Sequence, residues 1–304
     1  MNINFTRYSA VYYIFSGLLI VATIFSLFNY GLKFGIEFTG GSVVDGTFQG
    51  TVPSNEAITK SLSSFNLGEI TVQPIGKNEV SLTFKGVDET THQQIVSKIN
   101  ELSKFSETSF QYIGPSIGTE LRNKTELAII IALLAITLYI AFAFRKVSRP
   151  VSSWKYGLTS LVALFHDVLI PVGVFSVLGK LYNVEITIPI IAALLTILGF
   201  SVHDTIVIFD RIRENILRRG GHSFEETVNW SLNQTIGRSI STVITVLLVL
   251  FAIFFLGGET LKYFSMALII GITSGAYSSI FIASPLLVTW ENHRQRKMAK
   301  NRGK

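Results

Sequence analysis

The sequence predicts a polytopic α-helical membrane protein with six transmembrane helices and one small α+β domain outside the membrane. Of its 304 residues, 48% are hydrophobic and 15% are charged, whereas soluble domains carry about 25% charged residues. The hydrophobic residues gather into runs close to or above the ~20 residues that cross a hydrocarbon core of ~30 Å. These runs lie at about 11–30, 127–144, 156–178, 186–209, 239–256 and 264–290.

Basic residues indicate how these helices are oriented. The first run exceeds the ~7–15 residue core of a cleavable signal, and no small-x-small site precedes Gly31, so we expect an uncleaved anchor. Short loops rich in Lys and Arg stay in the cytoplasm, and the loops on one side offer only Lys180 and Lys262. The basic residues of the other side are Arg7, Arg145, Lys146, Arg149, Lys155, Arg211, Arg213, Arg218, Arg219, Arg238, Arg294, Arg296, Lys297, Lys300, Arg302 and Lys304. We therefore expect both termini in the cytoplasm, and the net charge of +6 reflects this bias rather than a nucleic-acid partner.

The roughly 95 residues between the first two runs change their pattern from period 2 to period 3.6 and back. Alternation predicts strands at 41–49, 69–75, 79–85 and 107–113. Amphipathic spacing predicts a helix after Pro53-Ser54, with Ser54 as its N-cap, and a second helix over 88–105. The order βαββαβ is that of a ferredoxin-like domain.

The predicted organisation has four parts. They are the cytoplasmic N-terminus and first span at 1–30, an outer domain at 31–125, a bundle at 126–290 with cytoplasmic loops at 145–155 and 210–238, and a basic cytoplasmic tail at 291–304. Two glycine clusters flank the outer domain, and their members are Gly35, Gly40, Gly41, Gly114 and Gly118. Such glycines allow tight turns and positive φ, so they either fix the pose of the domain or act as a hinge.

The outer domain carries no pattern typical of an enzyme or of a cofactor site. Gly76-Lys77 is followed by Asn78 and has no glycine at phosphate-loop spacing before it. The chain has no cysteine, which excludes a thiolate metal site. His92 stands among acidic and amide residues and is interpreted as a surface histidine. We expect no enzymatic activity, no metal, no nucleotide and no other cofactor.

Ionisable residues inside the predicted spans are the main functional indication. They are His166 and Asp167 in the third run, His203 and Asp204 in the fourth, and Arg238 at the start of the fifth. A charge in a span costs at least ~2.5–3.5 kcal/mol on insertion scales, so it indicates function by default. Polar residues at helical spacing around them are expected to face one another. They are Ser201 and Thr205 in the fourth run, Ser241, Thr242 and Thr245 in the fifth, and Thr273, Ser274, Tyr277 and Ser278 in the sixth. In the sixth run, Gly271 and Gly275 also permit close contact with another helix.

Two interpretations of these groups stay open. They form either a static buried network or a proton relay, in which Arg238 is the best candidate counter-charge for Asp204. Histidines beside both aspartates favour the relay, because imidazole titrates near neutral pH. Pro171, one turn beyond Asp167, is expected to kink its helix.

After the fourth run, the charged group Asp210, Arg211, Arg213 and Glu214 emerges into the cytoplasm. It serves either as ordinary juxtamembrane anchoring or as a docking surface for a partner. The following stretch, 222–237, is interpreted as an amphipathic helix at the membrane surface, with Trp230 as its interface anchor.

Several of these motifs match a known family. They are GIEFTGG at 35–41, IGPSIGTEL at 113–121, the His-Asp pair of the third run, FSVHDTIVIFDRIREN at 200–215, and NQTIGRSISTVIT at 233–245. In these motifs, and over essentially its whole length, the chain resembles the SecF family of protein-export membrane proteins, the partners of SecD. This family is related to the resistance-nodulation-division (RND) transporters, so the resemblance implies half of an RND-type bundle.

The resemblance implies a role in protein export across the bacterial cytoplasmic (inner) membrane. SecDF-type complexes associate with the SecYEG channel and use the proton gradient, not a nucleotide, to help pull unfolded preproteins outward. Unfolded preprotein would bind the outer domain, and accessory proteins of the YajC and YidC type are conceivable further partners. The family's proton-carrying aspartate and arginine map onto Asp204 and Arg238. Many relatives have Asp where Glu37 stands and Asn where His203 stands.

Two other functions compete with this one. A proton-coupled RND-type small-molecule exporter would carry about twice as many spans, so this chain would be a half-unit of one. A structural scaffold of the translocation channel would need the buried charges only for assembly.

Overall fold

The computed structural model describes residues 3–144, 151–218 and 222–302. Five of the basic residues used for the topology, Arg145, Lys146, Arg149, Arg219 and Lys304, lie outside the described residues. The chain forms two compact units. The helical unit is Met1–Asn29, Ala128–Val174 and Ala192–Lys304, and the domain unit is Tyr30–Leu127 and Phe175–Ile191.

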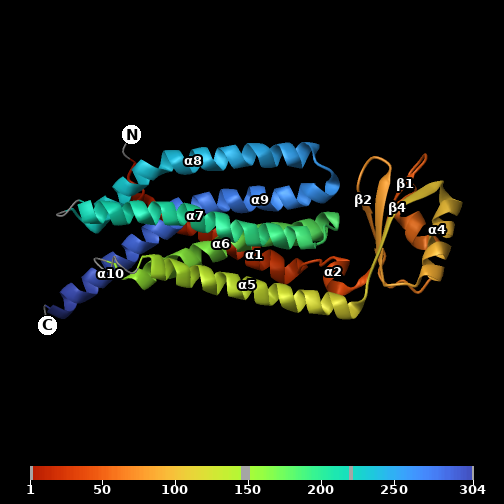
Figure 1. Cartoon of the computed structure of the whole chain (residues 1–304), viewed down its shortest axis with the longest axis horizontal. Helices are drawn as coiled ribbons and strands as arrows, with labels where there is room; N and C mark the ends of the chain where they lie inside the picture. The colour runs from red at the N-terminus through yellow and green to blue at the C-terminus, as the bar shows by residue number, and fades with distance from the viewer. Residues whose placement is uncertain (1–2, 145–150, 219–221, 303–304) are drawn as a thin grey trace. The chain divides into compact units, whose positions relative to one another are not determined.

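Six membrane-spanning helices are found among the described residues, as the hydropathy predicts (Figure 1). A 3₁₀ turn, η1 (Thr6–Tyr8), precedes the first of them. The helices are α1 (Ser9–Tyr30), α5 (Pro115–Ala143), α6 (Ser153–Tyr182), α7 (Ile188–Arg218), α8 (Phe224–Leu256) and α9 (Glu259–Ser278). Helix α9 continues through a π-helical turn, η2 (Ser279–Ala283), into α10 (Ser284–Arg302). Large apolar side chains stay exposed along α1, α5 and α8, for example Leu18, Leu138 and Leu248. Lipid would cover such a surface, which water would not tolerate.

The predicted loop at 210–238 is largely helical, and the helix predicted at 222–237 is present from Phe224 as the first part of the longer helix α8. Helix α7 runs on to Arg218 and α8 begins at Phe224, so residues 210–218 and 224–238 belong to the ends of two long helices. Ser223 caps α8 through a capping box with Glu226, which satisfies backbone donors of its first turn. The helix then passes straight through Gly237, because one glycine costs only about 1 kcal/mol relative to alanine.

Helices α7 and α9 pack closely, as the Gly271-x-x-x-Gly275 spacing predicts. A Cβ atom on Gly271 would stand 2.1 Å from Cδ1 of Ile197, and one on Gly275 would stand 3.0 Å from Cβ of Ser201. The first distance is shorter than real Cβ contacts and the second is tighter than most of them, so glycine at these two positions favours the close approach of the two helices.

The domain unit contains the ferredoxin-like sheet that the alternation predicts. Its elements are β1 (Gly41–Phe48), α3 (Asn55–Ser61), β2 (Thr71–Pro74), β3 (Glu79–Phe84), α4 (Glu89–Leu102) and β4 (Phe105–Ile113). The sheet order is β2-β3-β1-β4 with every neighbouring pair antiparallel. Val44 pairs with Leu82 on one side and Phe110 on the other, and the core beneath includes Ile95 and Ile99 of α4.

His92 is not the surface histidine that its polar neighbours suggest. It is 3% exposed, its ring stacks on Phe110 at 3.7 Å between centroids, and its Nε2 lies 3.0 Å from a carboxylate oxygen of Glu107. His92, Ile95 and Ile99 share one helical face, so helical spacing points His92 at the sheet whatever its sequence neighbours are.

The glycine clusters are packed tightly at two positions. Gly40 follows the short helix α2 (Ile36–Thr39) and has a φ of 73°, a conformation that favours glycine. A Cβ on Gly40 would lie 2.7 Å from Cα of Pro115, and one on Gly118 would lie 2.8 Å from the nitrogen of Gly40. These two glycines therefore fit α2 against the start of α5, and a hinge at the clusters stays a prediction.

Candidate functional site

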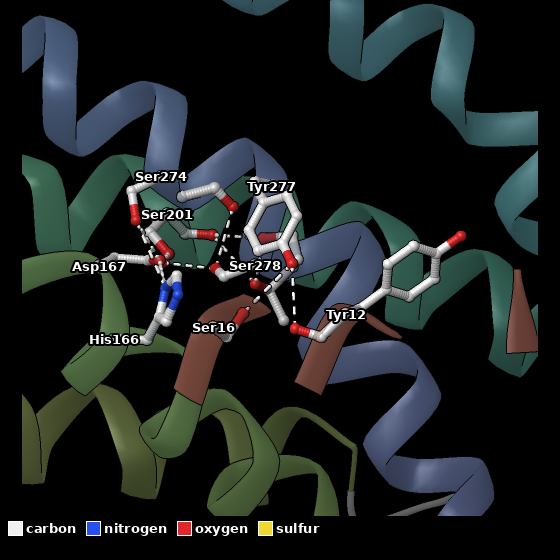
Figure 2. Close-up of polar contacts among 11 residues, drawn as sticks. Tyr12, Ser16, His166, Asp167, Ser201, Ser274, Tyr277 and Ser278 are labelled. Carbon is white, nitrogen blue, oxygen red and sulfur yellow. Dashed lines mark hydrogen bonds and ion pairs between the residues drawn. The ribbon is translucent and has the colours of Figure 1, made fainter. Parts of the chain in front are cut away.

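The most connected polar group in the helical unit is Asp167 of α6, which is fully buried (Figure 2). Its Oδ2 accepts hydrogen bonds from the hydroxyls of Ser201 in α7 and Ser278 in α9, both at 2.6 Å. Its Oδ1 accepts one from Ser274 of α9 at 3.2 Å and lies 3.0 Å from Nδ1 of His166. We call these five residues the Asp167 cluster. Hydrogen bonds to a charged group are each worth about 1.5–3 kcal/mol, so the cluster ties α6, α7 and α9 together.

The sequence builds this cluster from short local spacings. Ser274 and Ser278 are four residues apart and so share a face of α9. Gly275, beside them, brings that face close to Ser201. Pro171 lies inside α6. Because proline has no backbone N–H, the carbonyl oxygen of Asp167 lacks its usual helical hydrogen bond at this turn.

Tyr277 connects the cluster to α1. Its hydroxyl donates to the carbonyl oxygen of Tyr12 at 3.2 Å and accepts from Ser16 at the same distance. Its ring lies over that of His166, with 6.0 Å between centroids. Figure 2 shows these side chains converging from α1, α6 and α9. Polar groups of four helices are thus linked at one level of the unit.

His166 has one ring nitrogen engaged and one free. Nδ1 faces Asp167, whereas Nε2 is buried and has no hydrogen-bond partner among the described residues. His166 and Ser274 also line an apolar cavity of about 460 Å³ between α1, α6 and α9. If Nδ1 carries the proton that faces Asp167, Nε2 is a hydrogen-bond acceptor.

Asp204, one turn from Ser201 on α7, is 8% exposed. Its Oδ1 accepts a hydrogen bond from Ser239 of α8 at 2.6 Å, and its Oδ2 is buried without a partner in the described parts of the chain. Next to it, Thr205 shares a 2.7 Å hydrogen bond with Ser279 in the π-helical turn. π-Helical turns inside α-helices are frequent at functional sites.

The expected ion pair between Asp204 and Arg238 is not formed, although both residues are described. Arg238 is exposed and, with Asp210, Arg211 and Glu214, lines a cavity of about 300 Å³ near the end of α7. Ser239 holds the position facing Asp204 instead. Consecutive residues on a helix point about 100° apart, so Arg238 and Ser239 cannot both face Asp204. The long basic side chain of Arg238 extends toward polar surroundings instead.

The polar stripe predicted on α8 does not pack against the other helices of this chain. Ser241, Thr242 and Thr245 are exposed, and His203 of α7 is exposed as well. The buried polar residues of α8 in this region are Thr235 and Ser239, which are four residues apart and could have been recognised by that spacing. Ser201 and Thr205 are buried as expected.

The charged group at the end of α7 is paired mostly within itself. Arg211 contacts Glu214 at 2.5 Å and Arg213 contacts Asp210 at 3.6 Å, while Arg211 also donates to Gln234 of α8 at 2.6 Å. These contacts join α7 to the start of α8. Docking of a partner here stays a prediction.

One buried ion pair was not anticipated from the sequence. Lys155 of α6 lies 3.8 Å from Glu291 of α10, and both are nearly inaccessible. Arg294 donates to the same carboxylate at 2.8 Å. Glu291 was overlooked because it follows the last apolar run and precedes the basic tail, where a single carboxylate looks solvated.

No group of three or more His, Asp or Glu side chains in the described ranges is placed to hold a metal ion. Absence of a cofactor remains an expectation.

Two family models match the chain. The model described as protein export membrane protein SecD/SecF, C-terminal, matches residues 92–293, and the SecD/SecF GG motif matches residues 25–52. The protein translocase subunit SecF of Thermobaculum terrenum is 44% identical over 95% of this chain and 94% of that protein. The SecF of Anaerolinea thermophila is 34% identical over 100% of this chain and 98% of that protein.

Solved structures agree with these matches. The crystal structure of SecDF, a translocon-associated membrane protein, from Thermus thermophilus has a TM-score of 0.86 at 33% identity. The match covers 96% of this chain and 39% of the SecDF chain, so this chain spans about two fifths of that protein. SecDF in its super-membrane-facing form gives a TM-score of 0.72 at 32% identity.

Proposed function

The chain belongs to the SecF family of protein translocase subunits, and from that premise we propose that it works with SecD as a proton-driven export device. In this proposal it lies in the bacterial cytoplasmic membrane with both termini inside. It uses the proton motive force to assist preprotein movement through the SecYEG channel. The outer domain contacts unfolded preprotein and changes its pose during the cycle. Accessory proteins of the YajC and YidC type would be peripheral to that cycle.

The observation that carries the proposal is the half-satisfied, buried carboxylate of Asp204. Oδ1 is held by Ser239 at 2.6 Å, and Oδ2 has no partner among the described residues. An isolated charge costs several kcal/mol at this depth, so binding a proton at Oδ2 changes the energetics of the site. In the charged state the carboxylate attracts the Ser239 hydroxyl, and in the neutral state that attraction weakens, which lets α8 shift against α7.

The remaining polar groups have supporting roles in this proposal. The Asp167 cluster, with His166, would take part in proton transfer or hold the helices in register for it. Arg238 and Asp210 line the cavity at the end of α7, where the guanidinium of Arg238 would place a fixed positive charge at the cytoplasmic end of the proton path. Arg238 thus acts at the exit of the path rather than as the direct counter-charge of Asp204.

The energy of one proton is sufficient for a conformational change. One charge crossing about 100 mV yields about 2.3 kcal/mol, and about 1.4 kcal/mol is tenfold in an equilibrium constant. A single proton therefore biases two poses of the outer domain roughly fiftyfold, and the pH gradient adds to this.

The test is Asp204→Asn in inverted membrane vesicles containing SecD and SecYEG, with export measured with and without an uncoupler. We expect the gradient-dependent part of export to be lost. Asp204→Glu, which keeps a carboxylate, should retain part of it, and Thr196→Val, on the exposed face of the same helix, should retain all of it. Undiminished gradient-dependent export by Asp204→Asn would refute the relay.

Co-purification separates the proposal from a scaffold role. A scaffold predicts that Asp204→Asn reduces the amount of SecD and channel recovered with the chain while the gradient dependence of the remaining complexes is unchanged. A relay predicts full recovery with the gradient dependence gone. A small-molecule exporter half-unit predicts that the channel does not co-purify at all.

A further inference from the structure

The connection between α6 and α7 is paired with the chain that follows α1. The N–H of Gly35 donates to the carbonyl of Ile186 at 2.9 Å, and the N–H of Ile186 donates to the carbonyl of Lys33 at 2.7 Å. Phe34 and Ile186 form a parallel bridge between the two segments. We call residues 33–35 and 183–187 together the clasp, and both segments belong to the domain unit.

Side chains reinforce the clasp and leave little free space in it. Lys33 donates from Nζ to Oδ1 of Asn183 at 2.6 Å, and Asn183 has a φ of 55°, which marks a tight turn. A Cβ on Gly35 would fall within contact of both the Glu37 carboxylate and the methyl group of Thr187. Glu37, the first-turn acid of α2, therefore lies against the clasp.

Glu185 is the acidic residue of the clasp. Its neighbours Val184 and Ile186 are buried at 1% and 2% exposure, and Glu185 itself is half-buried. Burial, followed by the Glu37 carboxylate, raises the pKa of Glu185 to about 7, while the Lys33 ammonium opposes the rise. Arg122 of α5 also lies at the clasp, with its guanidinium carbon 5.8 Å from the centroid of the Phe34 ring, and Lys180 lies in the last turn of α6. A solvated glutamate has a pKa near 4.3.

We propose that Glu185 is a second proton-binding site of this protein, and that the proton it binds holds the clasp closed. A neutral Glu185 can sit beside the Glu37 carboxylate without repulsion. A charged Glu185 places a second anion there, and Lys33, whose charge favours the ionised form of Glu185, already donates a hydrogen bond to Asn183. As a step of the export cycle this inference rests on the proposed function, whereas as a property of the clasp it stands alone.

The sign of the pH dependence follows from which state binds more protons. The closed clasp raises the pKa of Glu185 to about 7, and opening returns it to the solvated value. Between these two values the closed state holds the extra proton, so its stability is complete at low pH and falls as pH rises. From pH 6 to pH 8 the opening constant should increase about tenfold, and it should level off above the pKa.

The position of the clasp gives this site a role in coupling. The 183–187 segment joins α6, which carries Asp167, to α7, which carries Asp204. The 33–35 segment leads through α2 into β1 of the outer domain. In the proposed orientation Glu185 is on the outer side, where the proton gradient makes the solution more acidic. Its protonation would then fix the chain entering the outer domain to the ends of the two helices that carry the buried carboxylates.

Hydrogen–deuterium exchange tests the inference on the full chain with its SecD partner in lipid nanodiscs. The readout is protection of the peptides that contain the Gly35 and Ile186 amides, compared at pH 6 and pH 8 after correction for the intrinsic exchange rate. In the wild type we expect protection of both peptides to fall about tenfold. Glu185→Gln cannot ionise, so the protection of its peptides should fall less than twofold between pH 6 and pH 8. At pH 8 it should keep the protection that the wild type has at pH 6.

Two further variants make the outcome decisive. Glu37→Gln removes the neighbouring charge, so the loss of protection should begin at lower pH. Glu56→Gln, at an exposed position of α3, should behave as the wild type does. Wild-type protection that is equal at both pH values, or a tenfold loss that persists in Glu185→Gln, would overturn the inference. The exchange measurement does not depend on preprotein export. Its result can therefore be interpreted even if Asp204→Asn leaves gradient-dependent export unchanged.

Discussion

The two buried aspartates of the helical unit differ in how fully they are satisfied. Asp167 accepts hydrogen bonds from three serines on two other helices and lies beside His166. Asp204 accepts one, from Ser239, and keeps an oxygen without a partner among the described residues. A carboxylate with all its acceptor sites used is suited to holding helices together. A carboxylate with a vacant oxygen is suited to gaining and losing a proton.

Asp167→Ala should have the largest effect on stability. It removes the acceptor for three buried hydroxyls, and breaking such a buried network costs about 3–5 kcal/mol. Unfolding of the purified chain in mixed micelles measures the loss. Asp167→Asn, which keeps an acceptor oxygen, should lose less than half as much. Equal losses for Asp167→Ala and Asp204→Ala would remove the distinction between the two sites.

Ser239→Ala should cost about 1.5–3 kcal/mol, because it removes a hydrogen bond to a charged group. The matched control is Ser241→Ala on the same helix, where the side chain is exposed and the change should stay within about 0.5 kcal/mol. The same micelle unfolding experiment compares them. If Ser241→Ala proved as costly as Ser239→Ala, the face of α8 that packs on Asp204 would be assigned wrongly.

Gly275→Ala should cost about 1–3 kcal/mol by overpacking, since its Cβ would press on Ser201, a donor to Asp167. Gly237→Ala, where no atom lies within 4 Å of the added Cβ, should instead stabilise α8 by up to about 1 kcal/mol. Thermal denaturation midpoints of the two variants should therefore move in opposite directions. A midpoint for Gly275→Ala at or above the wild-type value would contradict the close packing of α7 on α9.

Asp204→Asn should have the smallest effect on stability, below about 1 kcal/mol, because the amide oxygen can still accept from Ser239. Its effect should appear in proton-driven export instead. A stability loss as large as that of Asp167→Ala would place Asp204 in the same structural class as Asp167. That result would favour a scaffold role for both carboxylates.

Much of this architecture could be predicted from local sequence. The six spans follow from apolar runs of sufficient length, and the βαββαβ order follows from changes of period. Gly271 and Gly275 mark a close helix contact through their spacing alone. Ser201 and Thr205 were placed correctly because three- and four-residue spacing defines a helical face.

Other features could not be predicted in this way. The interpretation of His92 failed because its sequence neighbours are polar while its helical face is apolar. The segment 210–238 is helical at 210–218 and 224–238, because charged residues indicate solvent but do not end a helix. Glu291 stands between the last apolar run and the basic tail, so its local sequence does not indicate that it pairs with the buried Lys155.

Local patterns in the sequence are enough to predict the six apolar spans, the βαββαβ order and the polar face of α7 that carries Ser201 and Thr205. The approach of Ser239, and not Arg238, to Asp204 and the convergence of three serines on Asp167 depend on the packing of the helices. The reason is geometric. Consecutive residues on a helix differ by about 100° in direction, so the partner of a buried group depends on the rotation and shift of each helix against its neighbours. Those quantities are fixed by packing across the whole unit, and no local pattern contains them.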